Sequence, residues 1–251
     1  MRPSRATARR VTVHLVPKTG TAVRGRRLRF PESPEAVARE LGGLAPDAPL
    51  SAVDVLTELG PSPEGGTVHV DRLVFAEAEG ARPPLAGPLA PSVAELAPEE
   101  APADGRPRLS RVASYGIVTG PDGRLLLSLI AEGFPGAGTW HLPGGGVDAG
   151  EGVREALRRE VFEETGQHGT VRELIAVTGH HRTAPPGPQV HGVWVFFHVH
   201  VGEPVTARVV ETGGSTSDCG WFTPEELGGL RLSTTARCGL GHLVGRPAGD
   251  R

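Results

Sequence analysis

Residues 140–166 read WHLPGGGVDAGEGVREALRREVFEETG, and this stretch carries the strongest local signals in the chain. At about 100° per residue on a helical wheel, its second half has one apolar face, formed by Val153, Ala156, Leu157 and Val161. Glu160, Glu163 and Glu164 fall within the same arc or at its edge, whereas Arg154, Glu155 and Arg158 take the opposite side. The stripe that should face the core therefore becomes a carboxylate cluster in the last turns.

Three glutamates at this spacing are poorly placed for the helix alone. They repel one another by a few tenths of a kcal/mol per pair even when exposed, and partial burial raises that cost unless a cation neutralises them. They also lie near the helix C-terminus, where the dipole disfavours anions. Such local conflicts are expected at functional sites. Oxygen-only ligands favour a hard divalent cation, Mg²⁺ or Mn²⁺.

The glycine run 144–146 comes directly before this helix. Glycine allows the backbone to approach a ligand closely, so a carbonyl here could face the metal. A glycine run alone is typical of a plain turn, and a helix end of the Glu-Glu-Thr-Gly type alone is a common glycine cap. Both together, at a fixed spacing, favour a functional site.

The order Gly145, Glu151, Arg159-Glu160-Val161, Glu163-Glu164 and Gly166 resembles the Nudix box of the Nudix hydrolases. The box covers Gly145–Gln167, and the wider resemblance runs from about Arg108 to the C-terminal region. Gln167 departs from the pattern, because the family usually has an aliphatic residue at this packing position.

The resemblance implies an α/β fold, an α/β/α sandwich with a mixed sheet. It further implies that Glu160 and Glu164 bind Mg²⁺ or Mn²⁺, with Glu163 as a further ligand or a base. The Gly144 carbonyl would complete the inner shell. Arg159 would orient the glutamates through a forked contact that lysine could not reproduce.

Other positions receive supporting roles from the resemblance. Gly145 and Gly166 are glycines of the box, and Glu151 would brace the loop or join a second metal. Glu211, in a later loop, is the best candidate for a general base, with an exposed loop carboxylate as the equal alternative. Trp140 and Trp221 could stack on a nucleotide base, although such aromatics more often belong to the core.

By this resemblance, the predicted function is Mg²⁺-dependent hydrolysis of a diphosphate linkage in a nucleoside diphosphate derivative, ADP-ribose-like or dNTP-like. The alternative is a Nudix domain kept as a nucleotide sensor, with the N-terminal part as effector. The three glutamates favour the enzyme, because non-catalytic members tend to lose them. The chain has no GxSxG motif of serine hydrolases and no GxxxxGK[ST] phosphate loop.

The composition of the chain limits the kinds of partner and the location to be expected. A net charge of −3 gives no general attraction to nucleic acid polymers, so the expected partner is a small nucleotide-type molecule. Two cysteines, Cys219 and Cys238, make no disulfide framework. No apolar run is long enough for a membrane span and no secretory signal is recognised, so we expect a cytoplasmic protein. A homodimer is compatible with the sequence.

The prolines divide the chain. Seven of them lie within residues 79–108, which favours an extended linker with a short helix at Ser92–Leu96. The predicted parts are an N-terminal region of unnamed α+β fold at 1–78, the linker at 79–108 and the Nudix domain at 109–251. Residues 1–105 could also build a dimer interface or a substrate lid.

Within the first part, strands are predicted at 11–16 and 68–75, and helices from Pro34 to about Leu41 and at Ser51–Leu59. The basic run Arg24–Arg29 is interpreted as a solvated strand flank in preference to a phosphate-binding patch. In the second part, strands are predicted at 111–119, 124–130, 171–178, 190–201 and 219–222, and helices at 151–165 and from 224 to 227.

Overall fold

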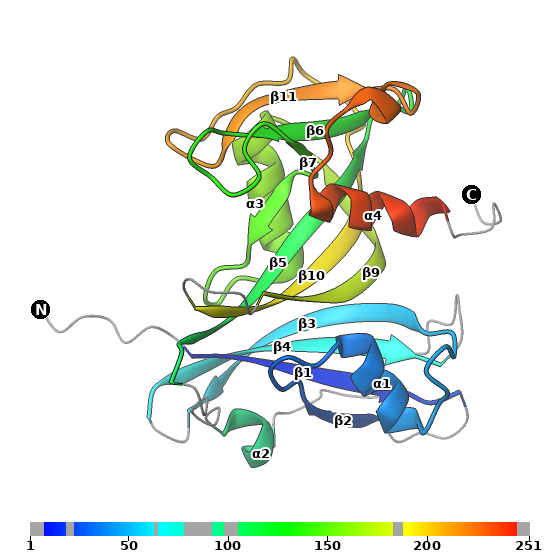
Figure 1. Ribbon diagram of the computed structural model, residues 1–251, viewed down its shortest axis with the longest axis vertical. Coiled ribbons are helices and arrows are strands. Elements are labelled where there is room, and N and C mark those ends of the chain that lie inside the picture. The colour runs from blue at the N-terminus through cyan, green and yellow to red at the C-terminus, as the bar shows by residue number, and fades with distance from the viewer. Residues whose placement is uncertain are drawn as a thin grey trace, which may run out of the picture. The chain divides into compact units, whose positions relative to one another are not determined.

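The computed structural model describes residues 8–18, 23–62, 65–77, 92–97, 105–182 and 188–244. It divides the chain into two compact units (Figure 1). One comprises Met1–Val112, Val147–Val153 and Val177–Trp194, and the other comprises Ala113–Gly146, Arg154–Ala176 and Val195–Arg251. No helix among the described residues is long and apolar enough to span a membrane.

The N-terminal residues build a four-stranded sheet with the order β2-β1-β4-β3 (Figure 1). Its strands are β1 (Ala8–Val16), β2 (Arg24–Arg27), β3 (Ser51–Pro61) and β4 (Thr67–Ala76). The central strands β1 and β4 run parallel, whereas β2 and β3 pair with them antiparallel. The strands predicted at 11–16 and 68–75 are confirmed.

Helix α1 (Pro34–Gly42) confirms the predicted helix in this region. It begins after Ser33, whose hydroxyl accepts a hydrogen bond from the Ala36 N–H, and a proline in the first turn needs no partner there. It ends at Gly43, which adopts the left-handed conformation with φ of 64°. Val37 and Ala38 are its buried apolar face.

The predicted helix at Ser51–Leu59 is wrong, because these residues form most of strand β3. Val53, Val55 and Thr57 are β-branched and alternate along the segment, which favours an extended strand. The segment pairs antiparallel with β4 along almost its whole length. Ladder hydrogen bonds to a buried central strand thus outweigh the apolar spacing that suggested a helix.

The predicted short helix at Ser92–Leu96 is confirmed as α2 (Val93–Leu96). Ser92 and Glu95 form a capping box, in which each side chain bonds the backbone N–H of the other residue. Leu96 packs with Val68 and Val70 of β4. Within the predicted linker at 79–108, residues 79–91 and 98–104 lie outside the described residues.

The second sheet follows the order β11-β6-β5-β10-β9, with β7 paired to β6 and β8 paired to β5. Its strands are β5 (Arg108–Thr119), β6 (Leu125–Ile130), β7 (Trp140–His141), β8 (Gly144–Gly146), β9 (Thr170–Arg182), β10 (Gln189–His200) and β11 (Thr216–Phe222). The helices are α3 (Val153–Thr165), the short 3-10 helix η1 (Glu226–Gly229) and α4 (Thr234–Val244). The strands and helices predicted here are confirmed, with small shifts of their ends, and so is the α/β class.

The turn between β5 and β6 shows how the local sequence shapes this part. Gly123 adopts φ of 80° and its N–H donates to the Gly120 carbonyl, which closes the turn at Gly-Pro-Asp-Gly. The two strands then pair antiparallel from Val118 and Thr119. Strand β6 thereby presents Ser128 beside β7 and β11, at the base of the candidate site.

Candidate functional site

Helix α3 carries the acidic cluster and confirms the helical wheel. Its apolar stripe is buried at Val153, Ala156, Leu157 and Val161. Glu155 and Arg158 are exposed on the other side. Along the buried side, exposure falls from 35% for the Glu163 side chain to 16% for Glu160, and Glu164 is only 4% exposed as a residue. The glutamates are therefore partly or wholly withdrawn from water.

Glu164 is held by three donors from outside α3. Its carboxylate accepts hydrogen bonds from the Thr216 hydroxyl at 2.6 Å, the Gly144 N–H at 3.0 Å and the Ser128 hydroxyl at 3.2 Å. These donors favour the charged form, but burial disfavours it more strongly and the nearby Glu160 adds repulsion. The pKa of Glu164 is consequently raised to about 7.

The glycine run allows the backbone of β8 to touch these carboxylates. Gly144 has φ of 141°, and a Cβ atom there would overlap the Ser114 carbonyl oxygen. A Cβ atom at Gly145 would lie 2.6 Å from an oxygen of Glu160. Any larger residue at either position would displace the strand or the carboxylate. The structure thus brings Gly144 next to Glu164 and Gly145 next to Glu160.

Arg159 joins two of the glutamates to the glycine run. Its Nη1 donates to Glu160 at 2.9 Å and to Glu163 at 3.1 Å, and its Nη2 donates to the Gly146 carbonyl at 3.1 Å. Burial nevertheless raises the pKa of Glu160, and repulsion from Glu163 and Glu211 adds to the effect. One guanidinium therefore does not balance the negative charge gathered here.

Glu211 reaches the same region from a distant loop. Its backbone N–H donates to the Glu163 carbonyl at 2.9 Å, and the Val210 N–H donates to the same oxygen at 2.8 Å. These bonds cap the C-terminal end of α3, where carbonyls lack helical partners. The Glu211 carboxylate is close enough to oppose ionisation of Glu160. The loop thus places the predicted base beside the cluster.

The Nudix box ends with a glycine in the left-handed conformation, Gly166, and a buried polar side chain, Gln167. Gly166 has φ of 69° and its N–H donates to the Phe162 carbonyl at 2.8 Å, as in a glycine-terminated helix. Gln167, the departure from the family pattern, is buried at 1% exposure. Its amide donates to the Val205 carbonyl and accepts from the Val205 N–H, each at 3.0 Å. A polar side chain is accommodated because both of its ends are paired.

Glu151 lies in the loop before α3. Its carboxylate accepts a hydrogen bond from the Asp148 N–H at 3.1 Å, and its own N–H donates to the Asp148 carbonyl at 3.1 Å. This reciprocal pairing closes the turn that leads into the helix. The Glu151 side chain thus braces the loop before α3.

Trp140 and Trp221, the two candidates for stacking on a nucleotide base, contact a phenylalanine ring and a glycine, respectively. The Trp140 ring packs edge to face on Phe222, with ring centroids 4.6 Å apart. The Trp221 ring lies against Gly120, at the turn between β5 and β6. Among the described residues, neither indole makes a hydrogen bond or a ring contact with the glutamates.

Three residues at the site were missed by the sequence analysis. Ser128 and Thr216 hold Glu164 from β6 and β11. Tyr115 of β5 is paired with Gly144 across the sheet, and burial together with Glu164 and Glu160 raises the pKa of its hydroxyl. No local pattern marks these residues, because they meet the cluster only through strand pairing.

The donor set suits a hard divalent cation. In the part of the chain that the structure describes, no three acidic, imidazole or thiol groups already converge in the manner of a metal shell. However, Glu160, Glu163 and Glu211 carry more negative charge than Arg159 neutralises, and the Glu160 carboxylate is partly desolvated. Buried carboxylate charge of this kind is relieved by a cation with a preference for oxygen ligands.

Comparisons with known proteins agree with the motif. The NUDIX domain model matches residues 109–237. A protein of Escherichia coli described as nucleoside triphosphatase NudI is 32% identical over 126 residues, which cover 46% of this chain and 84% of that protein. A MutT-like protein of Streptomyces ambofaciens is 33% identical over 121 residues, 48% of this chain and 69% of the relative.

Among solved structures, a MutT NUDIX hydrolase from Burkholderia pseudomallei is 32% identical. The match covers 54% of this chain and 98% of that protein, with a TM-score of 0.44.

Proposed function

The chain belongs to the Nudix family of hydrolases, and on that premise we propose that it hydrolyses a diphosphate linkage in an ADP-ribose-like or dNTP-like substrate with Mg²⁺ or Mn²⁺. The family acts on nucleoside diphosphate derivatives and generally uses divalent cations.

One observation carries the proposal: the partly desolvated carboxylates at the end of α3 lie against the backbone of β8. Glu164 accepts from the Gly144 N–H, and Glu160 lies close to the Gly145 Cα. An acidic cluster that served solubility alone would be exposed and would not need this backbone approach.

Glu160, Glu163 and Glu164 are the residues that would hold the cation, with the Gly144 carbonyl as a further oxygen donor. When bound, such a cation supplies Lewis acidity toward the diphosphate and toward water. Ser128 and Thr216 would keep Glu164 in one orientation, because their hydroxyls bond its two oxygens separately.

Arg159 would act as a positioning residue. Its guanidinium fork spans Glu160, Glu163 and the Gly146 carbonyl, so it links the helix to the glycine run. Glu211 would accept a proton from the attacking water, since its loop is tied to the Glu163 carbonyl and its carboxylate is near Glu160.

The relatives bear on which substrates are to be tried first. The Escherichia coli relative is described as a nucleoside triphosphatase, which favours nucleoside triphosphates among the substrates to be tried. Trp140 or Trp221 would have to turn a ring face toward a nucleotide base to stack on it.

The test is a phosphate-release screen of the full chain with Mg²⁺ against normal and oxidised dNTPs, ADP-ribose, NADH and nucleotide sugars. Glu164→Gln removes a proposed metal ligand, and Glu155→Gln is the matched control on the exposed side of the same helix. We expect turnover that is lost in Glu164→Gln and retained in Glu155→Gln. Equal turnover in all three proteins would refute the metal assignment.

The second candidate is a nucleotide sensor. Absence of turnover, combined with a ligand-dependent rise in melting temperature that Glu164→Gln abolishes, would favour it. The presence of all three glutamates disfavours the sensor, because a binding module does not need Glu160, Glu163 and Glu164 together.

We also propose the division into an N-terminal region at 1–78, a proline-rich linker at 79–108 and the Nudix domain at 109–251. The position of α2 supports an additional detail. Leu96 is 7% exposed and packs on β4, so part of the proposed linker is attached to the N-terminal sheet.

A further inference from the structure

One polar cluster of the N-terminal sheet lies against the loop that connects β8 to α3. Residues Val147–Val153, which include this loop, belong to the same compact unit as that sheet. Arg9 and His69 are opposite each other in the parallel pairing of β1 with β4, and Asp71 follows two residues later on β4. Because side chains alternate along a strand, His69 and Asp71 share one face of the sheet. The three side chains can therefore act together.

Two backbone groups of the loop are bound by this cluster. The Gly150 N–H donates to Nδ1 of His69 at 2.9 Å. Nη1 of Arg9 donates to the Val147 carbonyl at 2.6 Å. The loop is thus attached to the sheet near its beginning and near its end, by side chains from two adjacent strands.

These hydrogen bonds assign the proton of the His69 ring. Since Nδ1 accepts from Gly150, the proton of the neutral ring lies on Nε2, which donates to Asp71 Oδ1 at 2.9 Å. Nη2 of Arg9 also lies 3.1 Å from Nε2, but a protonated Nε2 has no lone pair to accept from it. Arg9 therefore supports the cluster through Asp71 and Val147.

Asp71 keeps the imidazole in this orientation. Its carboxylate is fully buried, accepts from the Thr57 hydroxyl at 3.1 Å and forms an ion pair with Arg9 Nε at 2.8 Å. A buried carboxylate requires such an opposite charge. His69 is itself only 1% exposed, so water does not readily replace either of its partners. The cluster thus presents one acceptor and one donor to the loop in fixed positions.

The loop joins the two elements that carry the proposed metal site. Gly146, the residue before it, accepts from Arg159 through its carbonyl, and Val153 after it begins α3. Within the loop, Asp148 and Glu151 are paired with each other. A change in the path of this loop would therefore shift the glycine run relative to the helix that bears the glutamates.

We propose that His69 is a positioning residue for the Nudix site, oriented by Asp71 and assisted by Arg9. It holds the Gly150 N–H and thereby fixes the loop between the glycine run and α3. The N-terminal region, for which the sequence suggested an effector, a dimer interface or a lid, would then support the Nudix box. The effect on catalysis rests on the proposed function, whereas the attachment of the loop does not.

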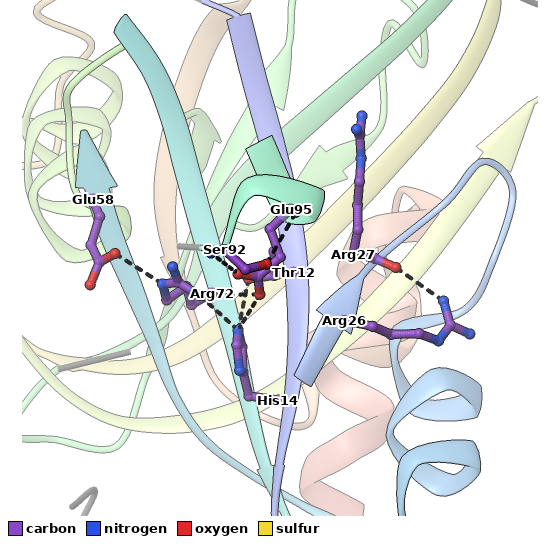
Figure 2. A network of polar contacts seen from close by, with 8 residues as sticks. All are labelled: Thr12, His14, Arg26, Arg27, Glu58, Arg72, Ser92 and Glu95. Atoms are coloured by element: carbon purple, nitrogen blue, oxygen red, sulfur yellow. Dashed lines mark hydrogen bonds and ion pairs between the residues drawn. The ribbon is translucent and has the colours of Figure 1, made fainter. Parts of the chain in front are cut away.

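The test compares three variants of the full chain. His69→Gln keeps a donor near the Nε2 position but loses the acceptor at Nδ1, whereas His69→Asn keeps an acceptor near Nδ1. His14→Gln is the matched control, because His14 is a buried histidine of the same sheet that bonds Thr12 and Arg72 instead of the loop (Figure 2). The measurements are the exchange rate of the Gly150 amide by NMR, the Mn²⁺ affinity by calorimetry, and kcat and KM.

We expect the Gly150 amide to exchange at least about fivefold faster in His69→Gln than in the wild type, as for the loss of one hydrogen bond. The Mn²⁺ affinity and kcat should fall roughly tenfold in this variant, with little change in KM, as for other residues that orient metal ligands. His69→Asn should retain most of the wild-type values. His14→Gln should retain them even if its melting temperature falls as far as that of His69→Gln.

Three results would overturn the positioning role: unchanged exchange of Gly150 in His69→Gln, equal losses in His69→Asn, or equal losses in His14→Gln. The last two would show that lower stability of the sheet, and not the bond to Gly150, weakens the site. If the wild type turns over no substrate, the proposed function fails. The Gly150 exchange rate and the Mn²⁺ affinity, which should change in His69→Gln alone, then still decide whether His69 positions the loop.

Discussion

Glu155 and Glu164 are the same amino acid on the same helix, and their surroundings make them chemically different. Glu155 is exposed, whereas Glu164 is 4% exposed and surrounded by Ser128, Gly144 and Thr216. Burial raises the pKa of Glu164 to about 7, so at neutral pH its proton is held weakly enough to be displaced by a cation.

This pKa predicts how the metal-free protein responds to pH. The folded-state pKa of Glu164, about 7, lies above the reference value of 4.5. The folded state therefore prefers the protonated form, and the associated stability is complete below pH 4.5 and is lost as the pH rises through 7. In EDTA, we expect the free energy of unfolding from urea titrations to fall across this window.

The free energy of unfolding should change less with pH in the Glu164→Gln variant, because a neutral amide does not titrate. Added Mg²⁺ should restore wild-type stability on the alkaline side without helping the variant to the same extent. If the free energy of unfolding depended on pH in the same way for both proteins in EDTA, the raised pKa of Glu164 would be contradicted.

Arg159→Lys tests the guanidinium fork. Lysine keeps the positive charge but cannot contact Glu160, Glu163 and the Gly146 carbonyl in one plane. We expect kcat to fall roughly 10–100-fold, as for other residues that orient metal ligands, with little change in melting temperature. Arg158→Lys, on the exposed neighbour, is the matched control and should retain wild-type kcat. Equal kcat for the two variants would remove Arg159 from the positioning role.

At the level of elements, strand β8 is short, but it determines where the helix can place its carboxylates. It pairs with β5 through Gly144, Gly145 and Gly146, and two of these glycines lie against glutamates of α3. The packing of a three-residue strand thus sets the distance between the backbone and the acidic cluster.

The first and last glycines of β8 give a matched pair of substitutions. Gly144→Ala would place a methyl group into the Ser114 carbonyl at φ of 141°, whereas a Cβ at Gly146 meets nothing within 4 Å. We expect Gly144→Ala to lower the free energy of unfolding by about 2 kcal/mol or more, and Gly146→Ala to change it by less than about 0.5 kcal/mol. Urea denaturation of both variants checks this, and equal stabilities would contradict the close approach at Gly144.

At the level of the whole molecule, the first unit has its own buried polar network. Arg72 on β4 is fully buried and bonds Glu58 on β3 and His14 on β1, and it approaches Glu95 of α2 (Figure 2). Each partner comes from a different element, so the network joins β1, β3, β4 and α2. Burial lowers the pKa of His14 to about 4, and the charge of Arg72 adds to this effect. A neutral His14 can therefore lie beside Arg72.

The proposed linker predicts where a protease cuts the intact chain. A glutamate-specific protease should cut first after Glu99 or Glu100, which are followed by a proline-rich sequence with few apolar residues. The glutamates of α3 should resist, because the helix and its hydrogen bonds protect that backbone. Mass spectrometry of the earliest fragments checks this prediction, and first cleavage within α3 or β3 would contradict the proposed division.

Residues 140–166 alone were enough to predict α3, its buried stripe, the inward-facing glutamates and the family. These features depend on helical periodicity and on spacing within one short segment, which no distant partner has to supply. The hairpin at Gly120–Gly123 and the cap of α1 were predictable for the same reason, because turn and cap chemistry is local.

The tertiary structure was needed wherever a distant strand or loop provides the partner. Pairing with β4 made Ser51–Leu59 a strand, and the pairing of β6 with β11 brought Ser128 and Thr216 to Glu164. The approach of Glu211 to the end of α3 likewise depends on a contact across the fold. Burial and electrostatic surroundings are properties of the packed chain, and they determine how readily carboxyl groups such as those of Glu160 and Glu164 ionise.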